Sequence, residues 1–296
     1  MKRDKLAVII PTKDRPAELM RLLRSIASQK RAPDQIIIVD GGDEPVSAIS
    51  RSFPSLPIDY KRQVPASLTA QRNTGIRMLA DHITLVVFFD DDIVLEKDSI
   101  SLMMRFWEGT SVETGGAQFN IANEVYKKPA FFQKVFFVNT DKPNRILRSG
   151  FQGKASYVLE TISAQWLVGC AMVFRRHIFS EFMFDEWFSE YARYEDVDFT
   201  YRVGKKYPLY VVAEAKVKHM TRPEDISFSV SLGRMEVVNR LYFVKKHKDL
   251  SLHICYWALL GIFINNMLQG VLRRDLRYLR RARGNIIGLT RSVLCL

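Results

Sequence analysis

Cysteine is scarce in this 296-residue chain, whose three cysteines are Cys170, Cys255 and Cys295. An odd number of widely separated cysteines favours neither a disulfide framework nor a CxxC-type zinc site, so a reducing cytoplasm is expected. The first apolar run, residues 6–10, stops at Pro11 and is too short for the core of a signal peptide. Internal repeats and low-complexity tracts are also lacking.

Acidic residues are fewer than basic ones: 32 Asp and Glu stand against 44 Lys and Arg, with a pI near 9.6. This balance favours an anionic partner such as nucleic acid, a phosphorylated ligand or a membrane surface, and composition alone does not choose among them. With 47% hydrophobic residues, the chain can bury the core of one large domain with an appendage, or of two modest domains.

Three apolar runs show no alternation with polar residues: "LAVII" (6–10), "IIIV" (36–39) and "LVVFF" (85–89). Such runs are typical of parallel strands that are buried on both faces. Helical spacing of leucine and isoleucine follows Asp14, an expected N-cap, and a second helix should begin near Ser67. This alternation predicts an α/β fold with a mostly parallel open sheet flanked by helices.

Each of these strands ends in a polar turn: "PTKDR", "DGGD" and "DDD". Ligands of open α/β sheets bind at the carboxyl ends of strands, so these turns should converge on one crevice. Adjacent carboxylates beside a buried strand repel one another unless a cation offsets the cost, and such oxygen ligands suit magnesium or manganese. On a continued strand Asp90 and Asp92 would share a face that Asp91 does not, unless the turn breaks the alternation. The alternative is a solvated acidic turn that caps a following helix.

Six segments follow one another between residues 5 and 222: "VIIPTKDRP", "IIIVDGGD", "AQRNTGI", "FFDDDIVL", "WLVGCAMVFRR" and "YEDVDFTYRV". Together they resemble the nucleotide-sugar glycosyltransferases of family 2. The resemblance implies a GT-A fold and a metal-dependent enzyme that moves a sugar from a nucleotide diphosphate sugar to an acceptor hydroxyl. It also implies a manganese or magnesium cofactor.

The resemblance assigns the donor to six residues. Pro11, Thr12 and Asp40 would contact the base and ribose. Arg72 would lie near the base and diphosphate, and Asp90 and Asp91 near the ribose and donor sugar. Asp92 matches the metal ligand of the DxD motif. His219 follows a later strand and is a candidate second metal ligand, although a lone histidine is more often an ordinary polar residue.

The resemblance also assigns the acceptor side. Asp196 in "YED" resembles the general base, and Glu195 would bind acceptor hydroxyls or cap its helix. In "WLVGC", Gly169 would allow close approach and Trp166 would stack on a sugar. Two structural alternatives stay open, because the helix dipole favours acidic residues in a first turn and buried packing explains the tryptophan equally well.

The chemistry of glycosyl transfer fits these roles. The departing diphosphate oxygen gathers negative charge that a divalent cation stabilises, whereas the acceptor hydroxyl must lose a proton to a carboxylate. One base with one metal predicts inversion at the anomeric carbon. A retaining route needs a second carboxylate as nucleophile, and none is identified.

The C-terminal part, residues 226–296, is predicted to be a helical, basic extension of a transferase domain over residues 1–225. Residues 252–272 are long enough to span a bilayer but include polar side chains, and "RRDLRYLRRARG" follows them. Arginines interleaved with leucine and tyrosine suit a segment on an anionic leaflet. We therefore expect a protein peripheral to the inner face of the cell membrane, with a saccharide or lipid-linked acceptor. The alternative is a packed helical pair with a solvated basic face.

Two rival functions are less consistent with the sequence. A sugar nucleotidyltransferase needs a glycine-rich phosphate loop after the first strand, and "PTKDRP" contains no glycine. A non-catalytic basic module would bind nucleic acid or membrane, but the expected crevice is acidic and no nucleic-acid-binding signature occurs, so no nucleic acid partner is expected. The nucleotide, the sugar, the acceptor and the linkage do not follow from the sequence.

Overall fold

The structure is a computed structural model that describes residues 4–188, 193–221 and 225–294. The chain forms two units, which we call the sheet unit (Met1–Tyr126 with Ala155–Thr221) and the helical unit (Lys127–Lys154 with Arg222–Leu296). The boundary predicted after residue 225 lies after Thr221 in these units, and residues 127–154 group with the C-terminal helices.

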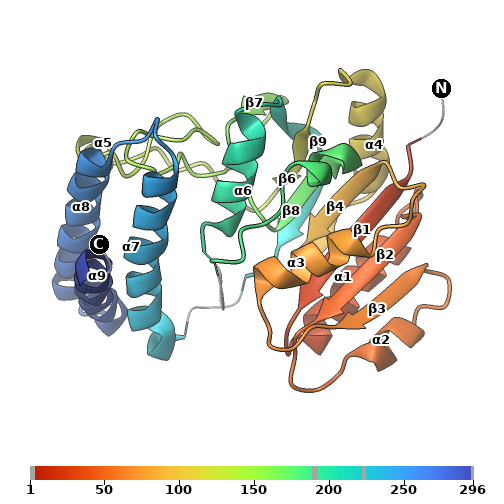
Figure 1. Ribbon diagram of the computed structural model, residues 1–296, viewed down its shortest axis with the longest axis horizontal. Helices are drawn as coiled ribbons and strands as arrows, with labels where there is room; N and C mark the ends of the chain where they lie inside the picture. The colour runs from red at the N-terminus through yellow and green to blue at the C-terminus, as the bar shows by residue number, and fades with distance from the viewer. Residues whose placement is uncertain (1–3, 189–192, 222–224, 295–296) are drawn as a thin grey trace. The chain divides into compact units, whose positions relative to one another are not determined.

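The sheet unit contains a nine-stranded sheet within the described residues (Figure 1). Eight strands lie in the following order: β3 (Ile58–Arg62), β2 (Gln35–Asp40), β1 (Leu6–Thr12), β4 (Leu85–Phe89), β8 (Ala171–Arg175), β6 (Gly116–Ile121), β9 (Leu209–His219) and β5 (Ile93–Leu95). The ninth, β7 (Ile162–Ala164), pairs with β9. Strands β1 to β4 pair in parallel, whereas β8 runs antiparallel to both β4 and β6. The α/β fold expected from the three apolar runs is confirmed.

The strands are apolar throughout because both faces of the sheet are covered. Leu6, Val8 and Ile10 of β1 pack on one face with α1 (Pro16–Ala27) and α4 (Ser99–Gly109). Ala7 and Ile9 point to the other face, which is covered by η1 (Arg176–Ser180), α3 (Leu68–Arg77) and α6 (Glu195–Gly204). A short helix, α2 (Ser47–Arg51), lies beside β3.

Two helix starts were predicted, and one of them is different in the structure. Ser67 caps α3 as expected, with its hydroxyl accepting from the N–H of Ala70. The expectation that Asp14 caps α1 is wrong, because Arg15 holds the N-cap position without a side-chain cap. Asp14 instead has a positive φ of 53° and accepts a hydrogen bond from the N–H of Asp43, which ties the first polar turn to the second.

The described part of the helical unit is built from η2 (Ile226–Phe228) and four α-helices: α5 (Phe131–Val135), α7 (Ser229–Lys246), α8 (Leu252–Leu272) and α9 (Leu276–Leu294). Helices α7 and α9 approach closely at Gly233, where a Cβ atom would lie 2.1 Å from the carbonyl oxygen of Arg281. A buried amide chain joins three helices, since Asn266 donates to Asn285, which donates to the carbonyl of Gly233.

Candidate active site

The polar turns of the first, second and third apolar strands meet at one edge of the sheet, as the parallel order requires. Thr12 lies opposite Asp40 in the ladder between β1 and β2, and Asp90 directly follows β4. The hydroxyl of Thr12 donates to Asp91 over 2.8 Å and so links the first turn to the third. The expected convergence is therefore observed.

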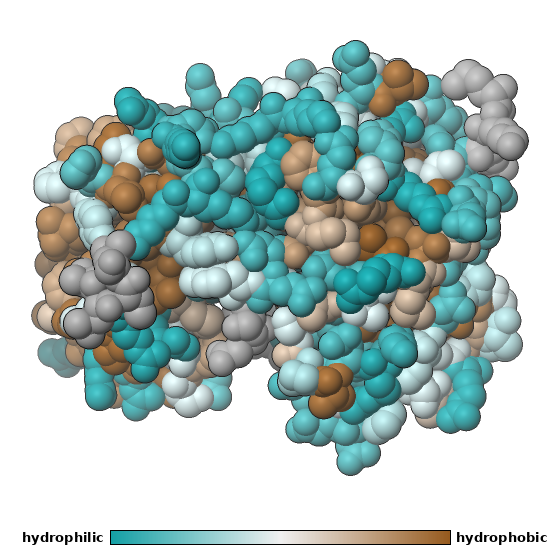
Figure 2. Space-filling model, in the orientation of Figure 1, coloured by the Kyte–Doolittle hydropathy of each residue, from teal (hydrophilic) through white to brown (hydrophobic). Residues whose placement is uncertain are grey.

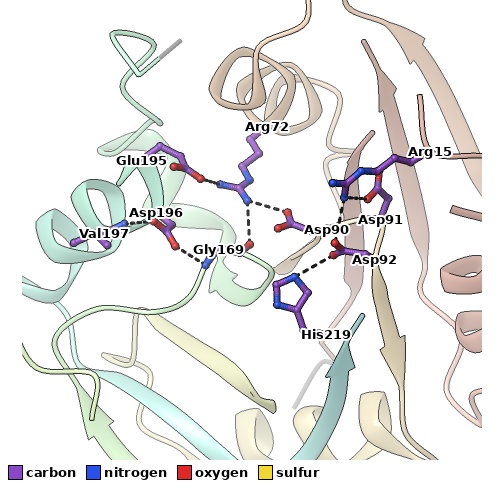
Figure 3. Close-up of polar contacts among 10 residues, drawn as sticks. All are labelled: Arg15, Arg72, Asp90, Asp91, Asp92, Gly169, Glu195, Asp196, Val197 and His219. Atoms are coloured by element: carbon purple, nitrogen blue, oxygen red, sulfur yellow. Dashed lines mark hydrogen bonds and ion pairs between the residues drawn. The ribbon is translucent and has the colours of Figure 1, made fainter. Parts of the chain in front are cut away.

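The three aspartates do not follow strand alternation (Figure 3). Asp90 points toward Arg72, whereas Asp91 and Asp92 both accept from Nη1 of Arg15 at 3.1 Å. The chain turns immediately after β4, and this turn separates Asp90 from the other two side chains. The solvated alternative does not hold for Asp91 and Asp92, which are 4% and 7% exposed.

Arg72 is a buried cation that joins the two sides of the site. Its Nη2 atom donates to Asp90 at 3.0 Å and to the carbonyl of Gly169 at 3.1 Å, and its Nη1 atom donates to Glu195 at 3.0 Å. The guanidinium also lies over the ring of Phe184. Because only 1% of Arg72 is exposed, its interactions with these partners must offset the free energy lost when its charge is removed from water.

Asp196 lies one hydrogen bond beyond this junction. Its two oxygens accept from the N–H groups of Gly169 and Val197, both at 2.8 Å. Gly169 is required for this approach, because a Cβ atom there would lie 2.9 Å from the Cβ of Asp196 and 3.1 Å from Nη2 of Arg72. These contacts hold Asp196 and Arg72 in place, whereas the close approach of an acceptor at Gly169 stays a prediction.

Both acidic residues at the start of α6 are stronger bases than free carboxylates. Burial raises the pKa of Asp196, and the hydrogen bonds from Gly169 and Val197 only partly oppose this effect. Burial and the charge of Asp196 raise the pKa of Glu195 to about 8, despite the nearby Arg72 cation. Glu195 is thus more than a helix-capping residue, because it accepts a hydrogen bond from the buried Arg72 and forms an ion pair with it once the pH exceeds about 8.

Asp91 lies between a hydroxyl and a cation. Burial raises its pKa to about 6, although the Thr12 hydroxyl and Arg15 both favour the ionised form. An additional positive charge near this carboxylate would stabilise its ionised form further.

Asp92 and His219, the two candidate metal ligands, lie close together. Burial alone would raise the pKa of Asp92, but the His219 contact and the charge of Arg15 lower it overall. Burial would lower the pKa of His219, but its contacts with Asp92 and Cys170 raise it to about 11. In this structure His219 therefore serves as a cation beside Asp92.

This pair fits a divalent cation. Nε2 of His219 lies 3.2 Å from Oδ1 of Asp92, so an imidazole nitrogen and a buried carboxylate oxygen face each other (Figure 3). A carboxylate and an imidazole suit manganese, and magnesium commonly binds one or two carboxylates together with substrate phosphates. The described residues include no group of three or more His, Cys, Asp and Glu side chains placed for a metal ion, so further ligands would come from the substrate and water.

Asp40 holds the second polar turn together. It is fully buried and accepts hydrogen bonds from four groups, namely the N–H groups of Gly42 and Val46, the Tyr60 hydroxyl and the Arg62 guanidinium. Burial alone would raise the pKa of Asp40, but these donors lower it overall. Pro11, in the buried strand β1, lies opposite Val39 in the ladder. Donor contacts by Pro11, Thr12 and Asp40 stay predictions.

Trp166 is only 5% exposed, as the packing explanation expects, and its stacking on an acceptor sugar stays a prediction.

Sequence reasoning missed two residues of the site, Arg15 and Gln71. The side chain of Gln71 donates to the carbonyls of Thr12 and Val39, which ties α3 to β1 and β2. Arg15 and Gln71 lie inside the quoted motifs, directly beside Asp14 and Arg72 respectively. Their position next to these candidate residues was the sequence feature that could have indicated them.

Similarity to solved structures supports the fold. The mannosyltransferase PcManGT from Pyrobaculum calidifontis, in complex with GDP-Man and Mn2+, is 12% identical with a TM-score of 0.61, covering 98% of this chain and 88% of that one. TarS 1–349 of S. aureus is 16% identical with a TM-score of 0.53, covering 90% and 74%. GalNAc-T7 with UDP, GalNAc and Mn2+ is 13% identical with a TM-score of 0.56, covering 74% and 44%. All three are GT-A glycosyltransferases, so the expected GT-A fold is confirmed.

Sequence comparison decides the family. None of the curated proteins compared with the chain matches it. The model of glycosyl transferase family 2, however, matches residues 7–183, which are more than half of the chain and carry five of the six quoted motifs. The sheet unit, with its acidic turn and buried Arg72 junction, therefore belongs to a nucleotide-sugar glycosyltransferase, and this chain is a member of glycosyl transferase family 2.

Proposed function

We propose that the protein is a metal-dependent, inverting glycosyltransferase in which Asp196 is the general base. The observation that supports this most directly is the hydrogen-bonded connection from Asp196 through Gly169 and Arg72 to Asp90. It fixes the proposed base relative to the acidic turn that would hold the donor. A raised pKa also makes Asp196 a better proton acceptor than an exposed aspartate.

The donor side uses the acidic turn. Asp92 and His219 would hold Mn2+ or Mg2+, which would stabilise the negative charge of the departing nucleoside diphosphate as a Lewis acid. Asp90 and Asp91 would face the ribose and sugar, while Pro11, Thr12 and Asp40 would form the base-binding edge. Two of the similar structures contain Mn2+, PcManGT together with GDP-Man and GalNAc-T7 together with UDP, which supports a similar donor here.

The acceptor side uses Asp196 and its neighbours. Asp196 takes the proton from the attacking hydroxyl, while Arg72 keeps the carboxylates of Asp90 and Glu195 in fixed positions. The other assigned carboxylates are each held by an arginine: Asp90 and Glu195 by Arg72, Asp91 and Asp92 by Arg15, and Asp40 by Arg62. Asp196 instead accepts from backbone N–H groups, and we therefore assign the base to it. One available carboxylate supports direct displacement and inversion. Glu195 and Trp166 would border the acceptor.

The acceptor class and the location are part of the same proposal. We infer a saccharide or lipid-linked acceptor used in polysaccharide biosynthesis, and a cytoplasmic protein held peripherally on the inner face of the cell membrane. The basic segment 273–283 supports this location, because its six arginines and one aspartate favour an anionic surface.

Replacement of the base tests the mechanism. Asp196→Asn should lower glycosyl transfer by about 10²- to 10⁴-fold, the usual contribution of a general base. Binding of the nucleoside diphosphate with Mn2+, measured by calorimetry, should persist. Glu214→Gln removes an exposed carboxylate on β9 and should leave both quantities unchanged. Full activity of Asp196→Asn would remove the assignment.

A donor panel tests the reaction class. The protein is incubated with UDP-, dTDP- and GDP-sugars and candidate acceptors, with Mn2+ or with a chelator, and nucleoside diphosphate release is measured. Glycosyl transfer predicts release that depends on the acceptor and stops on chelation. Pyrophosphate release from a nucleoside triphosphate and a sugar phosphate would instead indicate a nucleotidyltransferase.

A further inference from the structure

Helix α8 carries a continuous apolar stripe on its exposed face. The stripe comprises Trp257, Leu260, Ile264, the adjacent pair Met267 and Leu268, and Val271. Apart from that pair, successive members are three or four residues apart and so lie along one side of the helix. Apart from the half-buried Ile264, each is at least 41% exposed, and Val271 reaches 66%. Figure 2 shows apolar side chains gathered over the helices of this unit.

The opposite face of α8 is well packed, so the stripe is not an incomplete core. Asn266 on that face is buried and hydrogen-bonded to Asn285 of α9. At Gly270, a Cβ atom would lie 2.5 Å from the Leu279 side chain of α9. One face of α8 thus packs within the helical unit, and the other presents a large apolar surface to solvent. Soluble monomers seldom expose an apolar surface of this kind.

Basic and aromatic residues border the stripe. The stripe ends at Val271, and exposed Leu272, Arg273 and Arg274 follow directly. At its other end, Trp257 stacks on Phe136 beside α5 and donates to the carbonyl of Val135. Aromatic rings beside arginines and exposed aliphatic side chains are typical of segments that lie in the interfacial layer of a membrane.

We propose that this stripe is the contact surface for an anionic lipid bilayer, with α8 lying in the plane of the membrane. The aliphatic side chains would enter the boundary between headgroups and acyl chains, and the arginines of segment 273–283 would bind acidic headgroups. The proposal deepens the membrane location proposed above, but it stands independently of glycosyl transfer because lipid binding needs no sugar donor.

A membrane-spanning arrangement agrees less well with the structure. Among the described helices, α8 is the one long and apolar enough to cross a membrane. Helix α9 packs along it, however, and carries exposed Arg280, Arg283 and Arg291. If α8 spanned the bilayer, these arginines would lie at the same depth, where charged side chains are strongly disfavoured.

A second copy of the chain is the competing occupant of the stripe. Each copy has a formal net charge of +12, and its segment 273–283 contains six arginines and one aspartate, so two copies repel each other. Like charges placed opposite one another oppose binding, whereas an anionic lipid surface attracts the same segment. Charge complementarity therefore favours the lipid surface.

Vesicle flotation of the full-length protein tests the proposal. Wild-type protein should float with vesicles of phosphatidylcholine mixed with phosphatidylglycerol, and much less with phosphatidylcholine alone. The double variant Leu260→Glu and Leu268→Glu should lower the partition coefficient at least tenfold. Arg273→Gln and Arg274→Gln should each lower it about fivefold on anionic vesicles, the equivalent of ~1 kcal/mol per basic residue.

Leu159→Glu is the matched control, because Leu159 is 85% exposed but lies in the sheet unit. It should float like the wild type, and circular dichroism should show that all variants are folded. Equal flotation of the control and the α8 double variant would overturn the proposal. So would a wild-type dimer in sedimentation experiments without lipid that the double variant converts to monomer, since the stripe would then be a contact between copies.

Discussion

Removing the Arg72 guanidinium should destabilise the sheet unit far more than removing a surface arginine. Arg72 is 1% exposed and donates three hydrogen bonds of 3.0 to 3.1 Å, two of them to the carboxylates of Asp90 and Glu195. Arg72→Met keeps a side chain of similar length but leaves these carboxylates without their cation. Breaking one partner of a buried ion pair costs about 3–5 kcal/mol, so we expect a loss of roughly that size.

Urea unfolding and thermal melts measure this loss. For a unit of this size, about 2–4 °C is lost per kcal/mol, so Tm should fall by roughly 10 °C. The loss should be greater at pH 9 than at pH 6, because protonation of Glu195 relieves the unpaired charge at the lower pH.

Arg176→Met is the matched control, since the partly exposed Arg176 guanidinium pairs with the exposed Asp81, donates to the carbonyl of Ala80 and should contribute about 1 kcal/mol or less. A loss for Arg72→Met no larger than for this control would refute the view that Arg72 holds the site together.

Three further predictions concern the same site. Glu195 has a pKa of about 8 in the folded protein instead of 4.5, so between these pH values the folded state binds a proton that the unfolded chain has released. The free energy of unfolding should therefore fall as the pH rises from about 4.5 to about 8. Glu195→Gln should reduce this decline in urea unfolding, and an unchanged slope would contradict the assigned pKa. Gly169→Ala should lower kcat about 100-fold, because the added Cβ atom would displace Asp196. Gly109→Ala is the control and should leave kcat unchanged, because a Cβ atom there would have no neighbour within 4 Å. Equal rates in the two variants would exclude a positioning role for Gly169. Asp92→Asn should abolish the rise in Tm caused by Mn2+ with nucleoside diphosphate, and a retained rise would place the metal elsewhere.

The architecture could be predicted because its causes are local. Unbroken apolar runs require cover on both faces, and the structure gives β1, β2 and β4 that cover. Ser67 capped its helix as expected because a hydroxyl at an N-cap needs only the next turn. The cap predicted at Asp14 was wrong because the Asp14 carboxylate accepts a hydrogen bond from the N–H of Asp43 instead. This donor is 29 residues away, and no local sequence pattern indicates it.

The members of the site could be predicted better than their pairings. The motifs gave Arg72, Glu195 and Asp196 as neighbours of a donor or an acceptor, but not the buried ion pair between residues 123 positions apart. Arg15 was missed because its role depends on how the turn after β4 orients two carboxylates. Such pairings depend on side-chain directions across several elements, which spacing within one element does not determine.

The structure also explains why three aspartates follow one strand. The charge of Asp90 is already matched by Arg72, a buried cation that no ligand needs to replace. Asp91 and Asp92 share the guanidinium of Arg15, and Oδ1 of Asp92 also lies 3.2 Å from Nε2 of His219. The triplet is therefore divided between a carboxylate that fixes the frame of the site and two that face the proposed metal site. A divalent cation bound beside Asp92 would have to displace the proton of His219, because an imidazole coordinates a metal only through a deprotonated nitrogen.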